Sequence, residues 1–251
     1  MTGGASGIGR AACARLAEDG AKVLVCDLNA GGAEATAAQI GSAAAAMTMD
    51  VSSEEQWITA TDRAIELFGK LDVVANIAGI GAGGTIEEFD LDSWHAMVAV
   101  NLTGTLLGCK HGIKAIVKSG GAGAIVNMSS IGGLVGPADI VGYNATKGGV
   151  TILTKSVALH CAEKRYPIRC VSIHPTYVDS EMLDPVAQGA GVTRAELVAG
   201  MGKLVPMGRA ATPEDVAAAV AFAASDDAAM ISGSALVVDG AQLAGPPSAH
   251  F

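Results

Sequence analysis

The chain has 251 residues, 50% of them hydrophobic and 16% charged, and 25 acidic residues against 16 basic ones give a formal net charge of −9. This length and composition predict one soluble globular domain with a sizeable core, and they exclude a disordered chain. The acidic balance, without a basic cluster, argues against nucleic acid or an anionic membrane surface as the main partner. No apolar run approaches the ~20 residues of a membrane span, and the N-terminal sequence lacks the apolar core of a signal peptide.

Short apolar runs alternate with longer helical stretches along the whole chain. Strands are expected at 22–26, 44–49 (the weakest of them), 72–75, 124–128, 168–173 and 235–238. Helices are expected at about 8–18, 31–40, 54–68, 91–117, 143–164 and 213–224. Residues 52–55 (SSEE) resemble a capping box, and 212–215 (TPED) place proline at the first helical position. This alternation predicts a single doubly wound α/β domain over residues 1–251, in which a parallel sheet is covered on both faces.

The cysteines and histidines do not suggest a metal site. The five cysteines are scattered and form no CxxC pair: Cys13, Cys26, Cys109, Cys161 and Cys170. We expect them to be small buried residues of a protein in a reducing compartment, the cytoplasm by default. Four histidines lack metal-ligand spacing and are expected on helix surfaces or in packing positions: His95, His111, His160 and His174.

Residues 2–9 (TGGASGIG) form a glycine-rich turn that runs straight into a predicted helix. Glycines let the backbone approach a pyrophosphate, and the N-terminus of the helix offers unpaired N–H groups to phosphates. Asp27 ends the next strand, 18 residues after Gly9. A carboxylate there suits the ribose hydroxyls of NAD and repels the 2′-phosphate of NADP, although a solvated strand end is the alternative. The following strand ends at Asp50 and Val51, where an adenine contact is expected.

Three motifs resemble the short-chain dehydrogenases/reductases. Residues 2–9 are similar to that family's TGxxxGxG, residues 76–79 (NIAG) to its NNAG, and residues 143–147 (YNATK) to its YxxxK. The resemblance extends from residue 2 to about 243. It implies a Rossmann-type enzyme that transfers a hydride between NAD(H) and a secondary alcohol or ketone. The residues that it implies for NAD binding are Gly3, Ser6, Gly7, Ile8, Gly9, Asp27, Leu28, Asp50, Val51, Asn76, Ala78, Gly79, Tyr143, Lys147, Pro175, Val178 and Ser180.

Tyr143 and Lys147 are four residues apart on a predicted helix, so their side chains share one face. A free tyrosine has a pKa of ~10 and is a poor base near neutrality, and a nearby lysine cation favours the phenolate. The resemblance implies that Tyr143 is the general acid/base, that Lys147 lowers its pKa, and that Ser130 polarises the substrate carbonyl. It also implies that Asn101 holds a water in a proton relay. Taken alone, each of these residues is equally compatible with a surface, cap or turn position.

The chain departs from the family pattern in three places. Thr176 follows Pro175 where the family has glycine. Threonine restricts the backbone to fewer φ and ψ angles than glycine does. Residues 239–241 read DGA where DGG is common. A whole strand precedes the glycine-rich turn in the family, at the middle of the sheet, whereas this chain has only Met1. We expect the upstream genomic sequence to encode five or more further residues rich in Val, Ala and Leu.

Residues 181–207, where the family has a variable substrate lid, are mostly apolar. Their Met and Leu side chains suit an uncharged alicyclic, aromatic or steroid-like substrate, unless they only pack the lid itself. A 3-oxoacyl-[acyl-carrier-protein] reductase is the alternative enzyme, but Asp27 and the negative charge argue against it. A non-catalytic NAD-binding sensor on the same fold is the other alternative. The resemblance implies a homotetramer, and apolar residues continue along the Tyr143 helix beyond one core-facing stripe: Val150, Ile152, Leu153, Val157 and Leu159.

Overall fold

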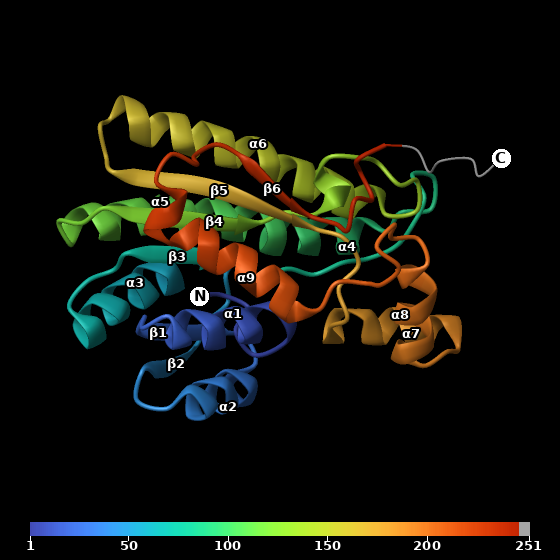
Figure 1. Cartoon of the computed structure of the whole chain (residues 1–251), viewed down its shortest axis with the longest axis horizontal. Coiled ribbons are helices and arrows are strands. Elements are labelled where there is room, and N and C mark those ends of the chain that lie inside the picture. The colour runs from blue at the N-terminus through green and yellow to red at the C-terminus, as the bar shows by residue number, and fades with distance from the viewer. Residues whose placement is uncertain (246–251) are drawn as a thin grey trace.

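Parallel strands form the centre of the molecule, for which we use a computed structural model that describes residues 1–245 (Figure 1). A first sheet pairs β1 (Val23–Asp27) with β2 (Ala44–Thr48). A second sheet contains, in spatial order, β3 (Val73–Asn76), β4 (Gly123–Met128), β5 (Ile168–Pro175) and β6 (Ala235–Val238). Every strand of the sequence prediction is therefore present, and the doubly wound parallel arrangement is confirmed.

Met1 and Thr2 join the two sheets. The N-terminal amine donates to Leu24 O at 3.2 Å, and Met1 O accepts from Cys26 N at 2.9 Å. On the other side, Thr2 N donates to Ala75 O at 3.0 Å. These two residues thus lie between β1 and β3 and bring the strands into the order β2-β1-β3-β4-β5-β6.

Helices cover both faces of the strands. One face is covered by α1 (Gly7–Glu18), α2 (Ala30–Ile40) and α9 (Pro213–Ala224). The other is covered by α3 (Glu54–Phe68), α5 (Gly104–Lys118) and α6 (Val141–Glu163). Because each central strand is buried on both sides, Val126 and Val171 are fully inaccessible to solvent. Continuous apolar runs, rather than alternating ones, are typical of such strands.

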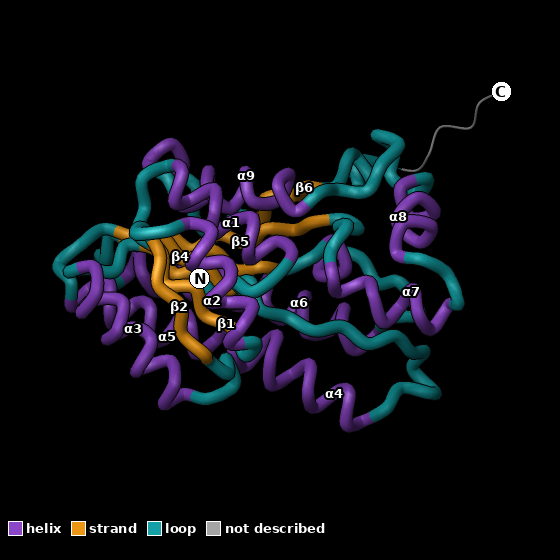
Figure 2. Tube along the Cα trace, turned by 90° about the horizontal axis from the view of Figure 1, so that it is seen from below, coloured by secondary structure: helices purple, strands orange, loops and turns teal. Residues whose placement is uncertain are grey.

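Short helices and long loops gather at one end of the molecule, beyond the carboxyl end of β5 (Figure 2). They include α4 (Leu91–Met97), α7 (Asp184–Ala190) and α8 (Arg194–Gly202). In α/β sheets, ligands bind at the carboxyl ends of the strands, so these segments surround the expected site.

The single helix expected at 91–117 is wrong in one respect. A π-helix, Val98–Thr103, separates α4 from α5. Asn101 lies in this wider turn, and its side chain hydrogen-bonds to the backbone of Ile80. An uninterrupted α-helix would point the Asn101 side chain in another direction. Gly104 follows directly, and a Cβ there would lie 2.9 Å from Val51 Cγ2, so α5 packs closely on the loop after β2.

The two expected helix starts had different outcomes. Pro213 begins α9, as predicted, and Thr212 and Asp215 form a reciprocal capping box there that was not predicted. Ser53 caps α3 by accepting from Gln56 N, but the reciprocal half of the box is absent within the described chain. The Gln56 side chain instead accepts a hydrogen bond from Asp50 N at 2.8 Å, which fixes the loop after β2.

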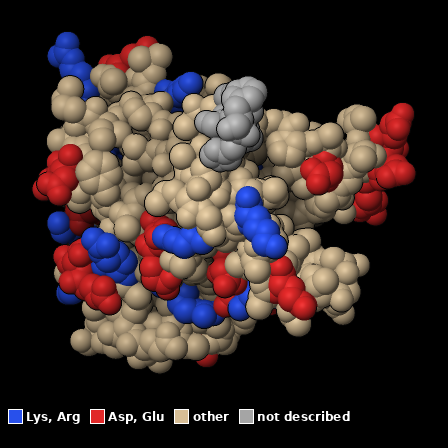
Figure 3. Space-filling view, turned by 45° about the vertical axis from the view of Figure 1, so that its right-hand side comes forward, with Lys and Arg blue, Asp and Glu red and all other residues tan. Residues whose placement is uncertain are grey.

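All five cysteines are buried and free in the part of the chain that the structure describes. No helix within residues 1–245 has both the length and the apolar character needed to cross a membrane. On the face seen in Figure 3, Lys and Arg side chains lie beside Asp and Glu, and much of the surface is uncharged.

Candidate active site

The glycine-rich turn is held tightly against the end of β3. Gly3 has a φ of +70°, and a Cβ there would lie 2.8 Å from Ala78 N. A Cβ on Gly9 would lie only 1.9 Å from Gly3 O. The Thr2 hydroxyl accepts from Ile77 N at 3.1 Å and from Ala78 N at 3.3 Å. Side chains are therefore excluded from this backbone cradle, as in the glycine-rich turns that let backbone approach a pyrophosphate.

The N-terminus of α1 opens onto this cradle. Ser6 precedes the helix in an extended conformation, and within residues 1–245 its side chain makes no capping hydrogen bond. The N–H groups of the first turn, from Gly7, Ile8 and Gly9, are thus left for a ligand, together with the positive end of the helix dipole.

Asp27 lies at the carboxyl end of β1, beside the cradle. Its Oδ2 accepts from Ala5 N at 3.0 Å and its Oδ1 accepts from Asn29 N at 2.9 Å. A carboxylate has about four acceptor sites, so two remain for a diol. Leu28, the next residue, is 72% exposed and leaves this edge open. The residues present therefore fit the adenosine end of a nicotinamide dinucleotide.

Other residues predicted for cofactor binding differ in where their side chains lie. Asp50 accepts from both the backbone and the hydroxyl of Ser52, and Val51 is buried against α5. Asn76 is 3% exposed, and its Nδ2 donates to Asn127 Oδ1 at 2.8 Å inside the sheet. Its side chain therefore belongs to the core, and its predicted part in cofactor binding is left to the backbone.

Tyr143, Lys147 and Ser130 come together where β4 ends and α6 begins. A Cβ on Gly132 would lie 3.6 Å from Ser130 Oγ and 3.7 Å from Tyr143 Cδ1, so both side chains lie beside the same residue. Lys147 Nζ lies 5.5 Å from the centre of the Tyr143 ring and donates to Met128 O at 2.8 Å. A Cβ on Gly79 would lie 3.3 Å from both Lys147 Nζ and Asn101 Oδ1, so the NIAG segment passes directly beside the same group.

Burial dominates the proton affinities of the pair. It raises the pKa of the Tyr143 phenol, and the nearby Ser130 hydroxyl opposes that increase. Burial lowers the pKa of the Lys147 ammonium from 10.5 to about 8. The lowered tyrosine pKa expected from the sequence is thus not found in the protein alone, where the net shift is upward.

Asn101 is fully buried, and its side chain is occupied by protein groups. Its Oδ1 accepts from Ile80 N at 2.8 Å, and its Nδ2 donates to Ile80 O at 2.9 Å and to Thr146 Oγ1 at 3.1 Å. This clamp fixes the loop after β3 against α6. The predicted relay through Asn101 stays a prediction.

The residues after β5 close the end of the site where the nicotinamide is expected. Pro175 ends the strand, Val178 is buried, and Ser180 lies against Gly7 in the glycine-rich turn. Thr176 N donates to Val238 O at 3.1 Å, and the Thr176 hydroxyl donates to Gln242 Oε1. The threonine thus fastens the loop after β5 to the segment after β6.

The sequence interpretation missed two contacts at this end. His174, expected to be a surface or packing residue, is fully buried on β5 and bonds to the backbone of Ser130. Arg10 donates to Glu181 Oε1 at 3.1 Å, which links α1 to the start of the lid. The signal for His174 was its place immediately before Pro175, at the end of the strand that neighbours the Ser130 strand. Within residues 1–245, no group of three or more His, Cys, Asp or Glu side chains could hold a metal ion.

The chain is similar to known proteins over nearly its whole length. A family model described as Enoyl-(Acyl carrier protein) reductase matches residues 3–241. Cyclohexanol dehydrogenase of Acinetobacter sp. (strain SE19) is 40% identical over 96% of this chain and 92% of its own length. The NADP-dependent (R)-specific alcohol dehydrogenase of Lentilactobacillus kefiri is 36% identical over 97% of this chain and 95% of its own.

A solved structure is also similar. The 3-ketoacyl-(acyl-carrier-protein) reductase of Brucella melitensis, crystallised with NADH, superposes with a TM-score of 0.86 at 34% sequence identity. The likeness covers 96% of each chain. Because the family model, the relatives and the fold agree over almost the whole sequence, the chain belongs to the short-chain dehydrogenase/reductase family.

Proposed function

We propose that the protein is an NAD(H)-dependent oxidoreductase that interconverts an uncharged secondary alcohol and its ketone. The observation that carries this proposal is that Tyr143, Ser130 and Lys147 lie together beside the NIAG segment, against which the glycine-rich turn packs. A nicotinamide cofactor, when bound, supplies or accepts the hydride. The tasks left to the protein are orientation of the substrate and transfer of one proton.

Each side chain has a distinct task in this proposal. Ser130 donates to the carbonyl oxygen and holds it within reach of Tyr143. In ketone reduction the Tyr143 hydroxyl gives its proton to that oxygen, and its raised pKa keeps it protonated near neutral pH. In alcohol oxidation the Tyr143 oxygen takes the proton from the alcohol hydroxyl. Lys147, when protonated, stabilises the phenolate formed during reduction and offers its ammonium to the nicotinamide ribose.

The preference for NAD over NADP follows from Asp27. Its carboxylate is already oriented by the amides of Ala5 and Asn29. It would accept from the ribose hydroxyls and repel a 2′-phosphate. The relative from Lentilactobacillus kefiri is NADP-dependent, so cofactor choice varies among similar chains. Comparable kcat/KM values with NAD and NADP would contradict the preference.

The proposed substrate is apolar and bulky, such as an alicyclic, aromatic or steroid-like alcohol. Large apolar side chains of the lid face solvent rather than each other, which argues against a purely structural role: Met182, Val186, Leu204 and Met207. Ile80 and Leu134, which follow β3 and β4, are also exposed at this end. The test is a panel of cyclohexanol, cyclopentanol, 1-phenylethanol and a 3α-hydroxysteroid with NAD, followed by NADH absorbance. Turnover of none of these alcohols would refute the substrate class.

Reduction of a 3-oxoacyl thioester is the second candidate, favoured by the similarity to the Brucella melitensis reductase. That reaction needs a surface for an acidic carrier protein, which the net charge of −9 disfavours. Acetoacetyl-CoA with NADH or NADPH separates the two candidates. Faster reduction of this thioester than of cyclohexanone would support the second.

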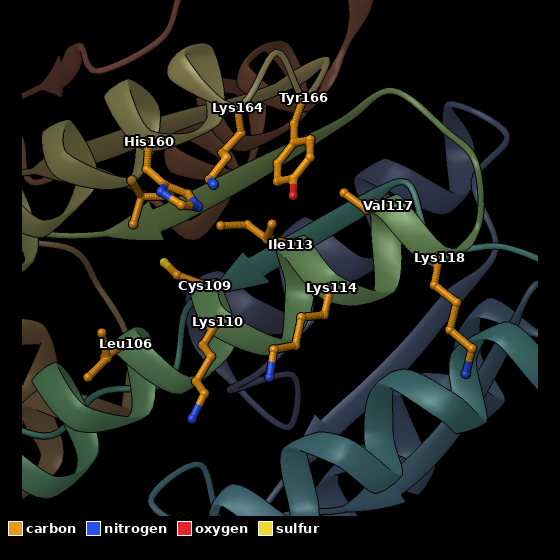
Figure 4. Close-up of a pocket in the computed structure, with 11 residues that line it drawn as sticks. Leu106, Cys109, Lys110, Ile113, Lys114, Val117, Lys118, His160, Lys164 and Tyr166 are labelled. Carbon is orange, nitrogen blue, oxygen red and sulfur yellow. The ribbon is translucent and has the colours of Figure 1, made fainter.

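We propose a homotetramer in which the α5 and α6 faces of two copies meet. A groove of about 650 Å³ runs between these helices (Figure 4). His160 and Tyr166 lie on one side of it and Ile113 and Val117 on the other. Ile152 is 61% exposed on α6, so an apolar face continues beyond the groove. A two-fold axis would cover this face with itself, and the exposed edge strand β6 offers a second interface. Light scattering at micromolar concentration that gives 24.9 kDa would refute this assembly.

The five free, buried cysteines support a reducing compartment, for which we propose the cytoplasm. Detection of the protein in an oxidising compartment would contradict this assignment.

A further inference from the structure

His174 is a buried histidine at the carboxyl end of β5, next to β4, which ends two residues before Ser130. It is fully inaccessible to solvent. Its Nδ1 lies 2.9 Å from Ser130 O, and its Nε2 lies 2.8 Å from Ser172 Oγ. Both ring nitrogens therefore have a hydrogen-bond partner, whereas a residue that served only to fill space would need neither.

The partners determine the tautomer of this ring. A backbone carbonyl can only accept, so Nδ1 carries the proton and donates to Ser130 O. Nε2 then accepts from the Ser172 hydroxyl. Burial lowers the pKa of His174, which keeps the ring in this neutral form.

This contact extends the pairing of β4 and β5 beyond their last paired residues. The regular ladder ends at Met128 and Ile173, and Ser129 N still donates to Ile173 O at 2.9 Å. One residue later, the backbone of β4 turns into a short 3₁₀ helix, Ile131–Gly133. The imidazole supplies the next cross-strand hydrogen bond, at the point where the backbone can no longer do so.

The Ser130 carbonyl thereby receives two donors, Gly133 N at 2.9 Å and the imidazole. Gly133 belongs to the same turn and moves with it, whereas His174 belongs to the neighbouring strand. The imidazole consequently supplies the hydrogen bond that holds the Ser130 carbonyl against the sheet. The Oγ of Ser130 is only two bonds away from the Ser130 Cα. The position of this oxygen therefore follows that of the peptide.

We propose that His174 is a positioning residue for the reaction, acting through its Nδ1–H on the backbone of Ser130. This inference rests on the proposed function, in which Ser130 holds the carbonyl oxygen beside Tyr143. Displacement of a catalytic group by about 1 Å costs up to ~100-fold in rate. Loss of this hydrogen bond should therefore lower kcat while leaving the glycine cradle, and with it NAD affinity, unchanged.

Two variants separate the two hydrogen bonds of the ring. In His174→Asn, the amide nitrogen can occupy the place of Nδ1 and donate to Ser130 O. In His174→Gln, the longer side chain reaches toward Ser172 and leaves Ser130 O without its cross-strand donor. Both variants are polar and can satisfy one partner, so both are expected to fold. His111→Asn is the matched control, because this buried histidine contacts Glu54 on α3, away from the site.

The measurements are kcat and KM with cyclohexanol, or with the alcohol of the panel above that turns over fastest, together with NAD affinity and thermal unfolding. We expect His174→Asn to keep kcat within about threefold of the unsubstituted protein, like His111→Asn. We expect His174→Gln to lose about 10- to 100-fold in kcat with unchanged NAD affinity. In a Ser130→Ala background the two His174 variants should have the same turnover, because the residue through which they act is gone.

Equal losses in His174→Asn and His174→Gln would overturn the inference, as would a further loss from His174→Gln in the Ser130→Ala background. If Ser130→Ala alone leaves turnover unchanged, the proposed role of Ser130 fails, and the positioning role fails with it. If Ser130→Ala is inactive but the His174 variants are alike, only the inference about His174 fails.

Discussion

The two halves of the candidate site are built in different ways. The cofactor half, from the glycine-rich turn to Asp27, is made of backbone held at short distances and of side chains bonded to that backbone. The substrate half, after β3, β4 and β5, exposes large apolar side chains such as Met182 and Met207 to solvent. Tyr143 and Ser130 lie where the two halves meet.

This difference shows where the chain tolerates change. A cradle defined by backbone has no room for an added methyl group, so its failure affects every substrate alike. An open apolar surface adapts to substitution and affects one substrate more than another. If this distinction is correct, substitutions in the two halves differ in which kinetic constant changes.

Tyr143→Phe, at the junction, should have the largest effect. The ring is kept, so packing and NAD binding should remain, but the proton is lost. We expect turnover to fall by about 10²- to 10⁴-fold, the usual contribution of general acid–base catalysis. Tyr166→Phe, in the α5–α6 groove, is the control and should retain full activity. A tenth of the original activity in Tyr143→Phe would exclude this residue as the acid/base.

Gly9→Ala should abolish NAD binding and lower stability. The added Cβ would lie 1.9 Å from Gly3 O, which is backbone and cannot rotate away. Gly136→Ala is the matched control, because no atom lies within 4 Å of a Cβ there. Calorimetric titration with NAD and thermal unfolding measure both effects. Normal NAD binding by Gly9→Ala would break the distinction between the two halves.

Asp27→Ala should reduce the preference for NAD over NADP by about 10- to 100-fold in the ratio of kcat/KM values. The loss corresponds to hydrogen bonds from a charged group, worth about 1.5–3 kcal/mol. Because the site of the change is remote from the substrate, the ratio between two alcohols should not alter. An unchanged cofactor ratio would show that Asp27 is only a solvated strand end.

Met182→Ser, in the lid, should raise KM for a bulky alicyclic alcohol by about tenfold or less, within the ~1–3 kcal/mol that small apolar contacts provide. NAD affinity should stay the same. Met230→Ser is the control, because Met230 is 95% exposed and precedes the amino end of β6. Equal effects of the two substitutions would show that the lid surface does not contact substrate.

Lys147 gives a pH-dependent prediction for stability. Its folded pKa of about 8 is below the ordinary value of 10.5, so between these pH values the unfolded chain binds more protons than the folded one. This contribution to the free energy of unfolding therefore rises with pH from about 8, by on the order of 1 kcal/mol per pH unit. Denaturant titrations of the protein and of Lys147→Met isolate it. A constant difference between the two from pH 7 to 10 would contradict it.

Much of the fold could be predicted because its signals are local. Apolar runs bounded by glycine give the strands, and a glycine-rich turn followed by a helix gives the cradle. Tyr143 and Lys147 are one helical turn apart, so sequence spacing is sufficient to bring them together.

Contacts between distant residues could not be predicted in this way. The hydrogen bond from His174 to Ser130 joins positions 44 residues apart, and that from Thr176 to Gln242 joins positions 66 apart. The π-helix at Val98–Thr103 was missed because apolar periodicity continues through it, although the hydrogen-bond register changes. Gln56 was not recognised as a partner of Asp50 because only tertiary packing decides between that contact and a capping box.

The junction at Met1 and Thr2 lies between two groups that contain four of the five cysteines. Cys13 and Cys26 pack around β1, and Cys161 and Cys170 pack around β5. Burial raises the pKa of the Cys13, Cys26 and Cys161 thiols, that of Cys13 to about 11, and the neighbouring Cys109 together with burial raises that of Cys170. Alkylating reagents can therefore modify these four thiols only when the surrounding structure opens. Each sheet thus contains thiols whose rate of labelling reports how often that sheet opens. Comparing the labelling half-times of the two groups in the native protein would reveal whether the sheets open as one cooperative unit or as two.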